Sequence, residues 1–230
     1  MRTVVLLPTY NEMENLPRLI PEIFTTVKTD LIIIDDNSPD GTGDYADKLS
    51  IENPAVSVIR RPCKMGLGSA YIAGFKKALE KNYDAVIQMD SDFSHSPADL
   101  PRLLAALENC DVVIGSRYIN GGGIEGWTFY RKWVSAIGNY YARGVLGNKV
   151  KDLTGGFKVF RRKVIESMDL NAVLSDGYAF QIETTFRALK KGFNVTEVPI
   201  VFRDRMFGCS KLSKKIIWEA FRIVWELKFQ

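Results

Sequence analysis

Two aspartates, Asp90 and Asp92, stand one residue apart, shortly after a short apolar run at residues 85–87. The apolar run predicts a buried strand, so both carboxylates lie where the chain leaves a sheet and enters a loop. Carboxylates so placed are typical ligands of a hard divalent cation that keeps waters and is completed by substrate phosphates. Ser96 and Pro97 then predict a helix start. For so short a pattern, a polar turn that only faces water is the alternative.

The segments before this loop predict the sheet that positions it. Apolar, β-branched runs predict strands at residues 3–7, 31–34 and 56–59, and apolar residues at helical spacing lie between them. This alternation is typical of an α/β fold, a mostly parallel sheet with helices on both faces. Because parallel strands align their carboxyl ends, Tyr10, Glu12 and Asp36 should share one edge with the two aspartates. Ligands of open α/β sheets bind at that edge.

The later segments predict a continuation of the same architecture. A strand is expected at 111–114, helices at 131–146 and 178–191, and a strand at 195–201 that Pro199 places at a sheet edge. Residues 119–130 are rich in glycine and are expected to form a flexible loop near the site, a candidate lid. Gly66 and Gly68 predict a tight turn into a helix rather than a nucleotide fingerprint, because Tyr71 stands where the third glycine would be.

Composition narrows the class of protein. The chain has 230 residues, 46% hydrophobic and 25% charged, with a net charge of +4, as expected for one large globular domain or two small ones. This mildly basic charge suits an acidic substrate or an anionic membrane surface and is too dispersed to indicate nucleic acid binding. Three cysteines without metal-type spacing favour a reduced, cytosolic compartment. No signal peptide or membrane-spanning stretch is expected.

Several motifs together resemble a known family. They are Leu7-Pro8-Thr9-Tyr10-Asn11-Glu12, Asp35-Asp36-Asn37-Ser38-Pro39-Asp40-Gly41-Thr42, Gly66-Leu67-Gly68, Met89-Asp90-Ser91-Asp92-Phe93-Ser94-His95, Gly115-Ser116-Arg117-Tyr118, Asp152-Leu153-Thr154-Gly155-Gly156-Phe157, Gly177-Tyr178-Ala179-Phe180-Gln181-Ile182-Glu183 and Asp204-Arg205 through Lys211. They resemble family 2 glycosyltransferases of the GT-A fold, and within that family the dolichol-phosphate (polyprenyl-monophosphate) mannose synthases. Ser91 replaces a commoner alanine, and the chain ends after one amphipathic helix whereas some members continue into membrane spans.

The resemblance implies a GDP-mannose donor, a dolichyl or other polyprenyl phosphate acceptor and a β-linked product. It implies that the nucleoside is held by Pro8, Tyr10, Glu12, Ile34 and Asp36. It implies that Mg²⁺ or Mn²⁺ and the diphosphate lie among Asp90, Ser91, Asp92 and Ser94. Phosphate groups would face Arg117, Arg205 and Lys211.

The chemistry of such a transfer explains the absence of an obvious general base. A polyprenyl phosphate is already an anion at neutral pH, so it needs cations to hold it in line rather than a base. Asp92 is the first candidate for holding the cation. Arg117, Arg131, Arg205 and Lys211 are the candidates for the acceptor phosphate, since arginine offers paired donors. His95, the only histidine, is expected to make a structural hydrogen bond.

Residues 212–230 form a separate segment after a catalytic domain at 1–211. An amphipathic helix is expected there, with Trp218, Trp225 and Lys214 as anchors at the cytoplasmic face of a membrane. Docking on the domain's own core, or on a small membrane-spanning partner protein, are the alternatives for its apolar face.

Other functions remain open from the residues alone. Asp36 and its neighbours do not distinguish guanine from uracil, so a UDP-glucose donor is the nearest alternative. Transfer to a saccharide hydroxyl would need a base, for which Glu183 is the only candidate. A nucleotidyltransferase is disfavoured because its Gly-rich, Arg-containing first loop is replaced by Thr9-Tyr10-Asn11-Glu12. A non-catalytic nucleotide-binding subunit is the alternative from a different class.

Overall fold

The computed structural model describes residues 1–173, 175, 177–204 and 214–229. In this part of the chain the strands are β1 (Thr3–Thr9), β2 (Asp30–Asp35), β3 (Val56–Arg60), β4 (Ala85–Gln88), β5 (Val112–Ser116), β6 (Gly123–Glu125), β7 (Lys158–Arg161), β8 (Val195–Pro199) and β9 (Val201–Arg203). The α-helices are α1 (Leu16–Thr26), α2 (Thr42–Glu52), α3 (Leu67–Glu80), α4 (Leu100–Ala106), α5 (Phe129–Leu146), α6 (Arg162–Ser167), α7 (Gly177–Lys190) and α8 (Lys214–Phe229).

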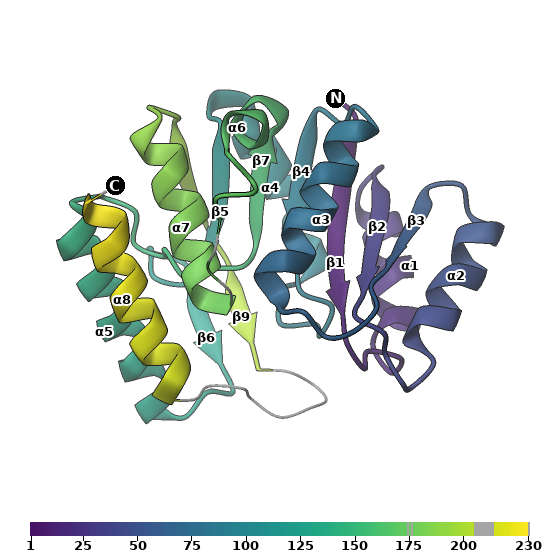
Figure 1. Ribbon diagram of the computed structural model, residues 1–230, viewed down its shortest axis with the longest axis horizontal. Coiled ribbons are helices and arrows are strands. Elements are labelled where there is room, and N and C mark those ends of the chain that lie inside the picture. Colours follow the sequence, from purple (N-terminus) through teal and green to yellow (C-terminus); the bar gives the residue numbers. More distant parts are fainter. Residues whose placement is uncertain (174, 176, 205–213, 230) are drawn as a thin grey trace.

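The described strands form a central sheet in the order β3-β2-β1-β4-β7-β5-β8 and a separate pair, β6 and β9 (Figure 1). All pairs in the central sheet are parallel except those that β7 makes with β4 and β5. This confirms the predicted α/β fold with a mostly parallel sheet. Pro199 ends β8, which lies at one end of the described sheet, as predicted.

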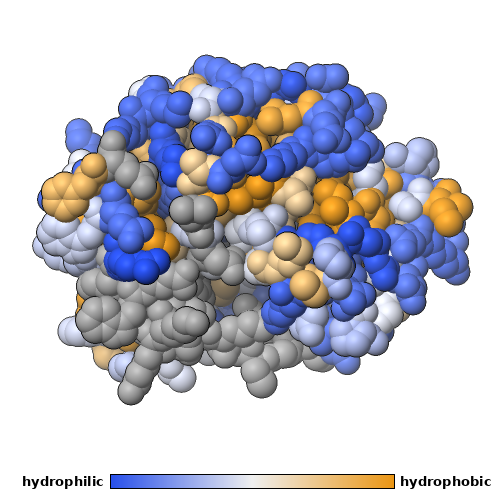
Figure 2. Space-filling model, in the orientation of Figure 1, coloured by the Kyte–Doolittle hydropathy of each residue, from blue (hydrophilic) through white to orange (hydrophobic). Residues whose placement is uncertain are grey.

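Successive side chains of the strands point to opposite faces of the sheet, which explains why helices cover both faces. Val4 and Leu6 of β1 belong to one apolar cluster, which includes side chains of α3, α5, α6, α7 and α8. Val5 and Leu7 belong to the other cluster, with side chains of α1, α2 and α4. Successive side chains of a strand point to opposite faces, so a strand that is apolar at every position is buried on both. In Figure 2, which shows the face of α3 and α7, apolar side chains gather toward the centre and hydrophilic ones cover the upper rim.

The antiparallel strand β7 follows from the path of the chain. After β5 the chain leaves the carboxyl edge of the sheet, forms β6 and α5, and returns to the same edge at Asp152. It therefore enters β7 from the carboxyl edge and runs opposite to its neighbours. The segment at 152–157 is thus brought between the ends of β4 and β5.

Three segments differ from the expected structure. The predicted loop at 119–130 contains a strand, β6, which pairs with β9, so that segment is partly ordered by a partner far away in sequence. The expected strand at 195–201 is divided between β8 and β9, which belong to different sheets. A third segment begins its helix with a 3-10 turn at Pro97–Asp99, and Ser96 makes no side-chain cap to it.

Helix α8 packs beside α5 and α7 (Figure 1). Its buried apolar side chains Ile223, Val224 and Leu227 belong to the same core cluster as α3 and α7. Docking on the domain's own core thus accounts for this part of the tail, while Trp225 and Phe229 are exposed. Among the described residues, no helix combines the length and apolar character needed to cross a membrane.

Candidate active site

A cavity of about 320 Å³ lies at the carboxyl edge of the sheet. Its walls come from the loops after β1, β2, β3, β4 and β5, the returning segment at 154–156, and the starts of α5 and α7. The predicted site residues that line it are Pro8, Tyr10, Glu12, Asp36, Asp90, Ser91, Asp92, Arg117 and Arg131. The parallel sheet therefore brings together residues that are up to 123 positions apart in sequence.

The loop at residues 90–95 is held to its surroundings by backbone and side-chain hydrogen bonds. Ser91 Oγ donates to the carbonyl of Pro8 at 2.9 Å, which ties the loop to the end of β1. The Asp92 carboxylate accepts from the Ser94 amide at 3.1 Å. Asp90 accepts from the hydroxyl of Tyr71 at 3.3 Å. Each of the two carboxylates thus has a defined position in the wall of the cavity.

His95 has a structural role in this loop, as expected. Its Nδ1 accepts from the Asp90 amide at 3.1 Å, and its ring stacks on Phe157 with centroids 4.9 Å apart. Burial lowers the pKa of the His95 imidazole, although the Asp90 carboxylate opposes the shift. The ring is therefore neutral at pH 7, with its proton on Nε2.

The oxygens of this loop fit a hard divalent cation. Asp90 and Asp92 offer carboxylates, and the buried Ser94 Oγ has no hydrogen-bond partner among the described residues. Gly156 leaves room beside Asp90, because a Cβ there would lie 3.7 Å from both carboxylate oxygens. Among the described residues, no group of three or more His, Cys, Asp or Glu side chains is placed to hold a metal ion by itself. Mg²⁺ is commonly bound by only one or two carboxylates together with substrate phosphates.

Asp36 lies in the cavity wall but is already engaged by a buried arginine. Arg61 Nε lies 2.8 Å from its carboxylate, and the Met65 amide donates to it at 3.2 Å. Burial raises the pKa of Asp36 above its ordinary value, and the Arg61 guanidinium only partly offsets this. Beside it, Lys64 Nζ lies 4.0 Å from the ring centre of Tyr10. Tyr10, Lys64 and Asp36 thus form one end of the cavity.

Arg117 forms a buried bidentate pair with Asp152. Its Nε and Nη2 each lie 2.7 Å from a carboxylate oxygen, and Nη2 also donates to Thr154 Oγ1. Burial raises the pKa of Asp152, but the Arg117 guanidinium outweighs this effect and keeps the pKa below its ordinary value. Two ionised groups therefore persist in the interior, and the pair orients Arg117 in the cavity wall.

Arg131 approaches the same part of the cavity from the first turn of α5. Its Nη1 lies 3.0 Å from the Asp204 carboxylate, and its guanidinium lies 4.0 Å from the ring centre of Trp127. Its buried Nε has no hydrogen-bond partner among the described residues. The cavity is thus lined by carboxylates at the end of β4 and by two arginines beyond the end of β5.

Helix α7 contributes Gln181 to the cavity and keeps Glu183 out of it. Both amide atoms of the buried Gln181 side chain have no hydrogen-bond partner among the described residues. Glu183 is buried between Ser175, whose hydroxyl donates to it, and Arg187, 2.7 Å away. Glu183 is not part of the cavity lining and is neutralised by an arginine, which counts against a role as general base.

Two of the described predicted residues, Ile34 and Ser94, are not part of the cavity lining. Ile34 is fully buried in the apolar core and is not part of the cavity lining, because the pleat of β2 directs it to the face of α3. Ser94 lies in the same loop as the aspartates, with its backbone carbonyl accepting from the Arg203 amide. Arg205 and Lys211 lie outside the described residues, as do the side chains of Lys214 and Trp218.

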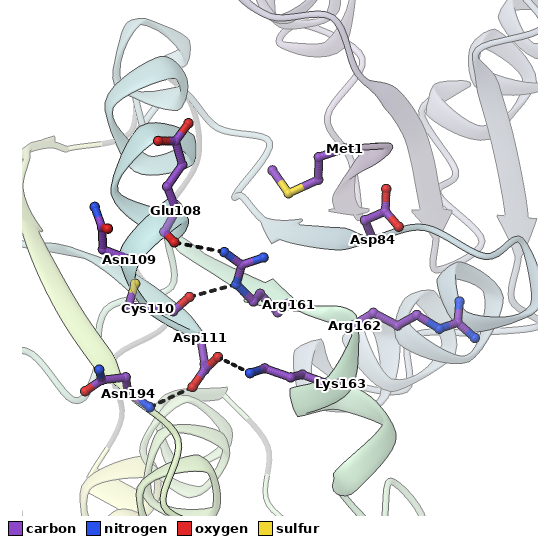
Figure 3. A pocket seen from close by; sticks show the side chains of 10 residues that line it. All are labelled: Met1, Asp84, Glu108, Asn109, Cys110, Asp111, Arg161, Arg162, Lys163 and Asn194. Carbon is purple, nitrogen blue, oxygen red and sulfur yellow. Dashed lines mark hydrogen bonds and ion pairs between the residues drawn. The ribbon is translucent and has the colours of Figure 1, made fainter.

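A second cavity, of about 690 Å³, lies at the opposite edge of the sheet (Figure 3). Its cationic groups are bonded to the protein itself: Arg161 donates to the carbonyls of Cys110 and Glu108, and Lys163 lies 2.6 Å from the Asp111 carboxylate. This mutual pairing makes the opposite edge a less suitable anion site than the cavity at the carboxyl edge.

Comparison with known proteins shows the family of this chain. Residues 4–169 match the family described as glycosyl transferase family 2. The chain belongs to glycosyltransferase family 2. It is 45% identical to an undecaprenyl-phosphate mannosyltransferase of Micrococcus luteus over 96% of this chain and 91% of the relative. It is 46% identical to a polyprenol monophosphomannose synthase of Mycolicibacterium smegmatis over 95% of this chain and 84% of the relative. The predicted resemblance to polyprenyl-monophosphate mannose synthases is thereby confirmed.

Solved structures with the same GT-A fold include glucosyl-3-phosphoglycerate synthase from Mycobacterium tuberculosis, in a complex with Mn²⁺, UDP-glucose and phosphoglyceric acid. The TM-score is 0.72 over 99% of this chain and 80% of that protein, at 18% sequence identity. At this identity the likeness establishes the fold of this family 2 glycosyltransferase.

Proposed function

We propose that this family 2 glycosyltransferase moves mannose from GDP-mannose to the phosphate of a dolichyl or other polyprenyl phosphate. The observation that carries the proposal is the sequence identity of 45% and 46%, over nearly the full length of this chain, to two relatives. The names of these relatives specify mannose and a polyprenyl phosphate or polyprenol. The cavity supports it, since its lining combines two carboxylates at the end of β4 with arginines beyond β5.

The donor half of the cavity suits a nucleotide sugar. Tyr10, Lys64 and Asp36 lie where a nucleoside would enter, and the loop at 90–95 lies beyond them. Asp90, Asp92 and Ser94 would hold Mg²⁺ or Mn²⁺, which when bound supplies positive charge to the departing diphosphate. The unsatisfied amide of Gln181 offers one donor group and one acceptor to sugar hydroxyls.

The acceptor half suits a phosphate monoester. Arg117 and Arg131 line this part, and Arg205 and Lys211 are proposed to join them. A phosphate oxygen of the lipid attacks the anomeric carbon as the bond to the GDP oxygen breaks, so no proton has to be removed. Attack from the face opposite the diphosphate inverts the anomeric centre and gives a β-linked product. Arg117, held by Asp152, would orient the attacking phosphate.

Because the proposed acceptor is a lipid, the enzyme would act at the cytoplasmic face of a membrane, to which it would be peripherally bound. The C-terminal helix would contribute through Trp225 and Lys228, which are exposed. A small membrane-spanning partner protein that uses the same helix is the rival explanation for its exposed apolar residues.

The test supplies the purified enzyme with a short-chain polyprenyl phosphate, Mg²⁺ or Mn²⁺, and either GDP-mannose or UDP-glucose. We expect lipid-linked mannose with GDP-mannose and no lipid-linked sugar with UDP-glucose. The lipid-linked mannose should have a β-anomeric NMR signature, and EDTA should abolish the activity. Transfer from UDP-glucose and not from GDP-mannose would contradict the donor. Release of free mannose with no lipid product would contradict the acceptor.

A further inference from the structure

Lys158, at the start of β7, is a fully buried lysine that the proposed transfer step does not use. It lies on the same face of β7 as Phe160, which belongs to the apolar cluster shared with α3 and α7. A methionine would fill a similar space without the free-energy cost of burying an amine. The amine should therefore do something that packing alone does not require.

The hydrogen bonds of this amine join β7 to one turn of α7. Lys158 Nζ donates to the backbone carbonyl of Gln181 at 2.6 Å and to Thr185 Oγ1 at 2.9 Å. Thr185 Oγ1 in turn donates to the same carbonyl at 3.0 Å. The three groups meet at one point and fix the turn at 181–185 against the sheet.

The turn so fixed carries the side chain of Gln181 into the cavity wall. Gln181 is only 2% exposed, and neither atom of its amide has a hydrogen-bond partner among the described residues. Because a buried amide without partners costs free energy, its presence at a cavity wall indicates a ligand that pairs with it. The carbonyl and the side chain belong to one residue, so the bond from Lys158 also sets the point from which the amide projects.

A second contact fixes α7 relative to the loop at 90–95. The ring of Phe180 stacks on that of Tyr71, with centroids 5.8 Å apart, and the Tyr71 hydroxyl donates to Asp90 at 3.3 Å. Lys158 holds the next residue of α7 from the side of the sheet. The Gln181 amide is therefore kept at a defined place relative to a carboxylate that is proposed to hold the cation.

We propose that Lys158 is a positioning residue for recognition of the donor sugar: it holds α7 so that the Gln181 amide pairs with sugar hydroxyls. This inference rests on the proposed function, in which the cavity binds a nucleotide sugar. A site built to pair with the hydroxyls of one sugar rejects a sugar that leaves its polar groups unpaired. Displacement of Gln181 should therefore weaken binding of the sugar and leave binding of the nucleotide, at the other end of the cavity, unchanged.

The test variant is Lys158→Met, which removes the amine and keeps most of its volume. The matched control is Thr184→Val, because Thr184 is also fully buried in this turn but its hydroxyl bonds to carbonyls of α7 itself. Isothermal titration calorimetry with Mg²⁺ and without acceptor measures the Kd of GDP and of GDP-mannose. We expect Lys158→Met to raise the Kd of GDP-mannose by about fivefold or more, through misplaced hydrogen bonds, with the Kd of GDP unchanged. The control should bind both as wild type does.

Gln181→Ala separates positioning from a general structural role. Alone, it should raise the Kd of GDP-mannose at least as much as Lys158→Met does. In the double variant Lys158→Met should add little, because the placement of an absent amide has no effect. If Lys158→Met does not fold, Thr185→Val, which removes one acceptor of the amine, takes its place with the same expected direction.

Three results would overturn the proposal: unchanged binding of GDP-mannose by the Lys158 variant, an equal loss of affinity for GDP, or effects of the two substitutions that multiply. The proposed function fails differently. Wild type that binds UDP-glucose in preference to GDP-mannose contradicts the proposed donor, and the same comparison then uses UDP and UDP-glucose. Sugar-dependent binding without transfer to the lipid contradicts only the proposed acceptor.

Discussion

The carboxylates of the loop at 90–95 are held in different ways. Asp90 accepts from Tyr71 and lies beside the neutral ring of His95, whereas Asp92 accepts from the backbone amide of Ser94. Burial, with the Asp90 carboxylate as a second cause, raises the pKa of the Tyr71 hydroxyl well above its ordinary value. Tyr71 therefore stays protonated and remains a donor to Asp90 at any pH at which the enzyme would work.

Asp92→Ala should lower kcat by about 10²–10³-fold, because charge stabilisation of the leaving diphosphate is lost. Binding of Mn²⁺, followed by electron paramagnetic resonance in the presence of GDP, should weaken in parallel. Asp99→Ala is the control, since Asp99 pairs with Arg102 outside the cavity lining. Full turnover by the Asp92 variant would rule out a role for this carboxylate.

Asp152→Asn should cost about 3–5 kcal/mol of unfolding free energy, because Arg117 would be left as a buried charge without its counter-ion. Asp44→Asn is the control: its carboxylate pairs with Arg60 at the surface, where ion pairs contribute little. Urea denaturation of both variants measures the difference. Equal unfolding free energies of the two variants would show that the Arg117–Asp152 pair does not stabilise the fold.

The residues of this site were predictable to different degrees. Asp90, Asp92 and Arg117 stand in motifs at strand ends, and the parallel sheet brings them to one cavity. Arg61 and Lys64 belong to no motif, but they follow β3, and the rule used for the other strands would have found them. Sequence alone does not show that Asp36 is bonded to Arg61, or that Ile34 faces the core, since both depend on side-chain packing.

At the scale of secondary-structure elements, the pair β6–β9 decides the shape of the cavity wall. It joins the segment after β5 to the segment after β8, and the Asp204 amide continues it by donating to the carbonyl of Glu125. The glycine-rich sequence at 119–130 predicts a loop because a strand of three residues has little pattern of its own. Its strand character comes from a partner about 80 residues away, which local spacing does not reveal.

Gly126→Ala should disturb this wall. Gly126 has a φ of 78°, and a Cβ there would lie 2.8 Å from the Cβ of Asp204, the partner of Arg131. We expect a loss of about 1 kcal/mol or more in unfolding free energy and a fall in kcat of about tenfold or more, from displacement of Trp127 and Arg131.

Gly138→Ala on α5 is the matched control. A Cβ at Gly138 meets nothing within 4 Å, so the change should stabilise the helix by about 1 kcal/mol and leave kcat unchanged. Thermal unfolding and steady-state kinetics of both variants test the pair. Similar effects at the two positions would contradict a special conformation at Gly126.

At the scale of the whole molecule, one buried amine sits in the centre of the sheet. Lys158 of β7 donates to the carbonyl of Gln181 at 2.6 Å and to Thr185 Oγ1 at 2.9 Å. Burial lowers the pKa of Lys158 to about 7, although the Asp152 carboxylate opposes the shift. The alternation of strands and helices predicts the layers, but not that β7 runs antiparallel and buries this lysine between β4 and β5.

The stability of the wild type should therefore depend on pH through Lys158. Between pH 7 and the ordinary lysine pKa of 10.5, the unfolded chain holds a proton that the folded protein has lost, so unfolding free energy rises with pH. Below about pH 7 the folded and the unfolded protein both hold this proton, so Lys158 no longer makes the unfolding free energy depend on pH. Relative to Lys158→Met, the wild type should gain about 2 kcal/mol between pH 7 and 9, measured by urea denaturation. A constant difference between the two proteins would show that Lys158 keeps its ordinary pKa.

The Arg117–Asp152 pair also closes the base of the excursion that leaves the sheet after β5 and rejoins it before β7. The segment between these two residues includes β6 and α5, which pack on β9 and α8, while most of the donor-side wall is built from other parts of the chain. We therefore expect that grafting residues 118–151 from a relative with a different lipid preference transfers that preference and leaves nucleotide choice as it was. A chimaera whose nucleotide choice changes as well would show that the two halves are not separable.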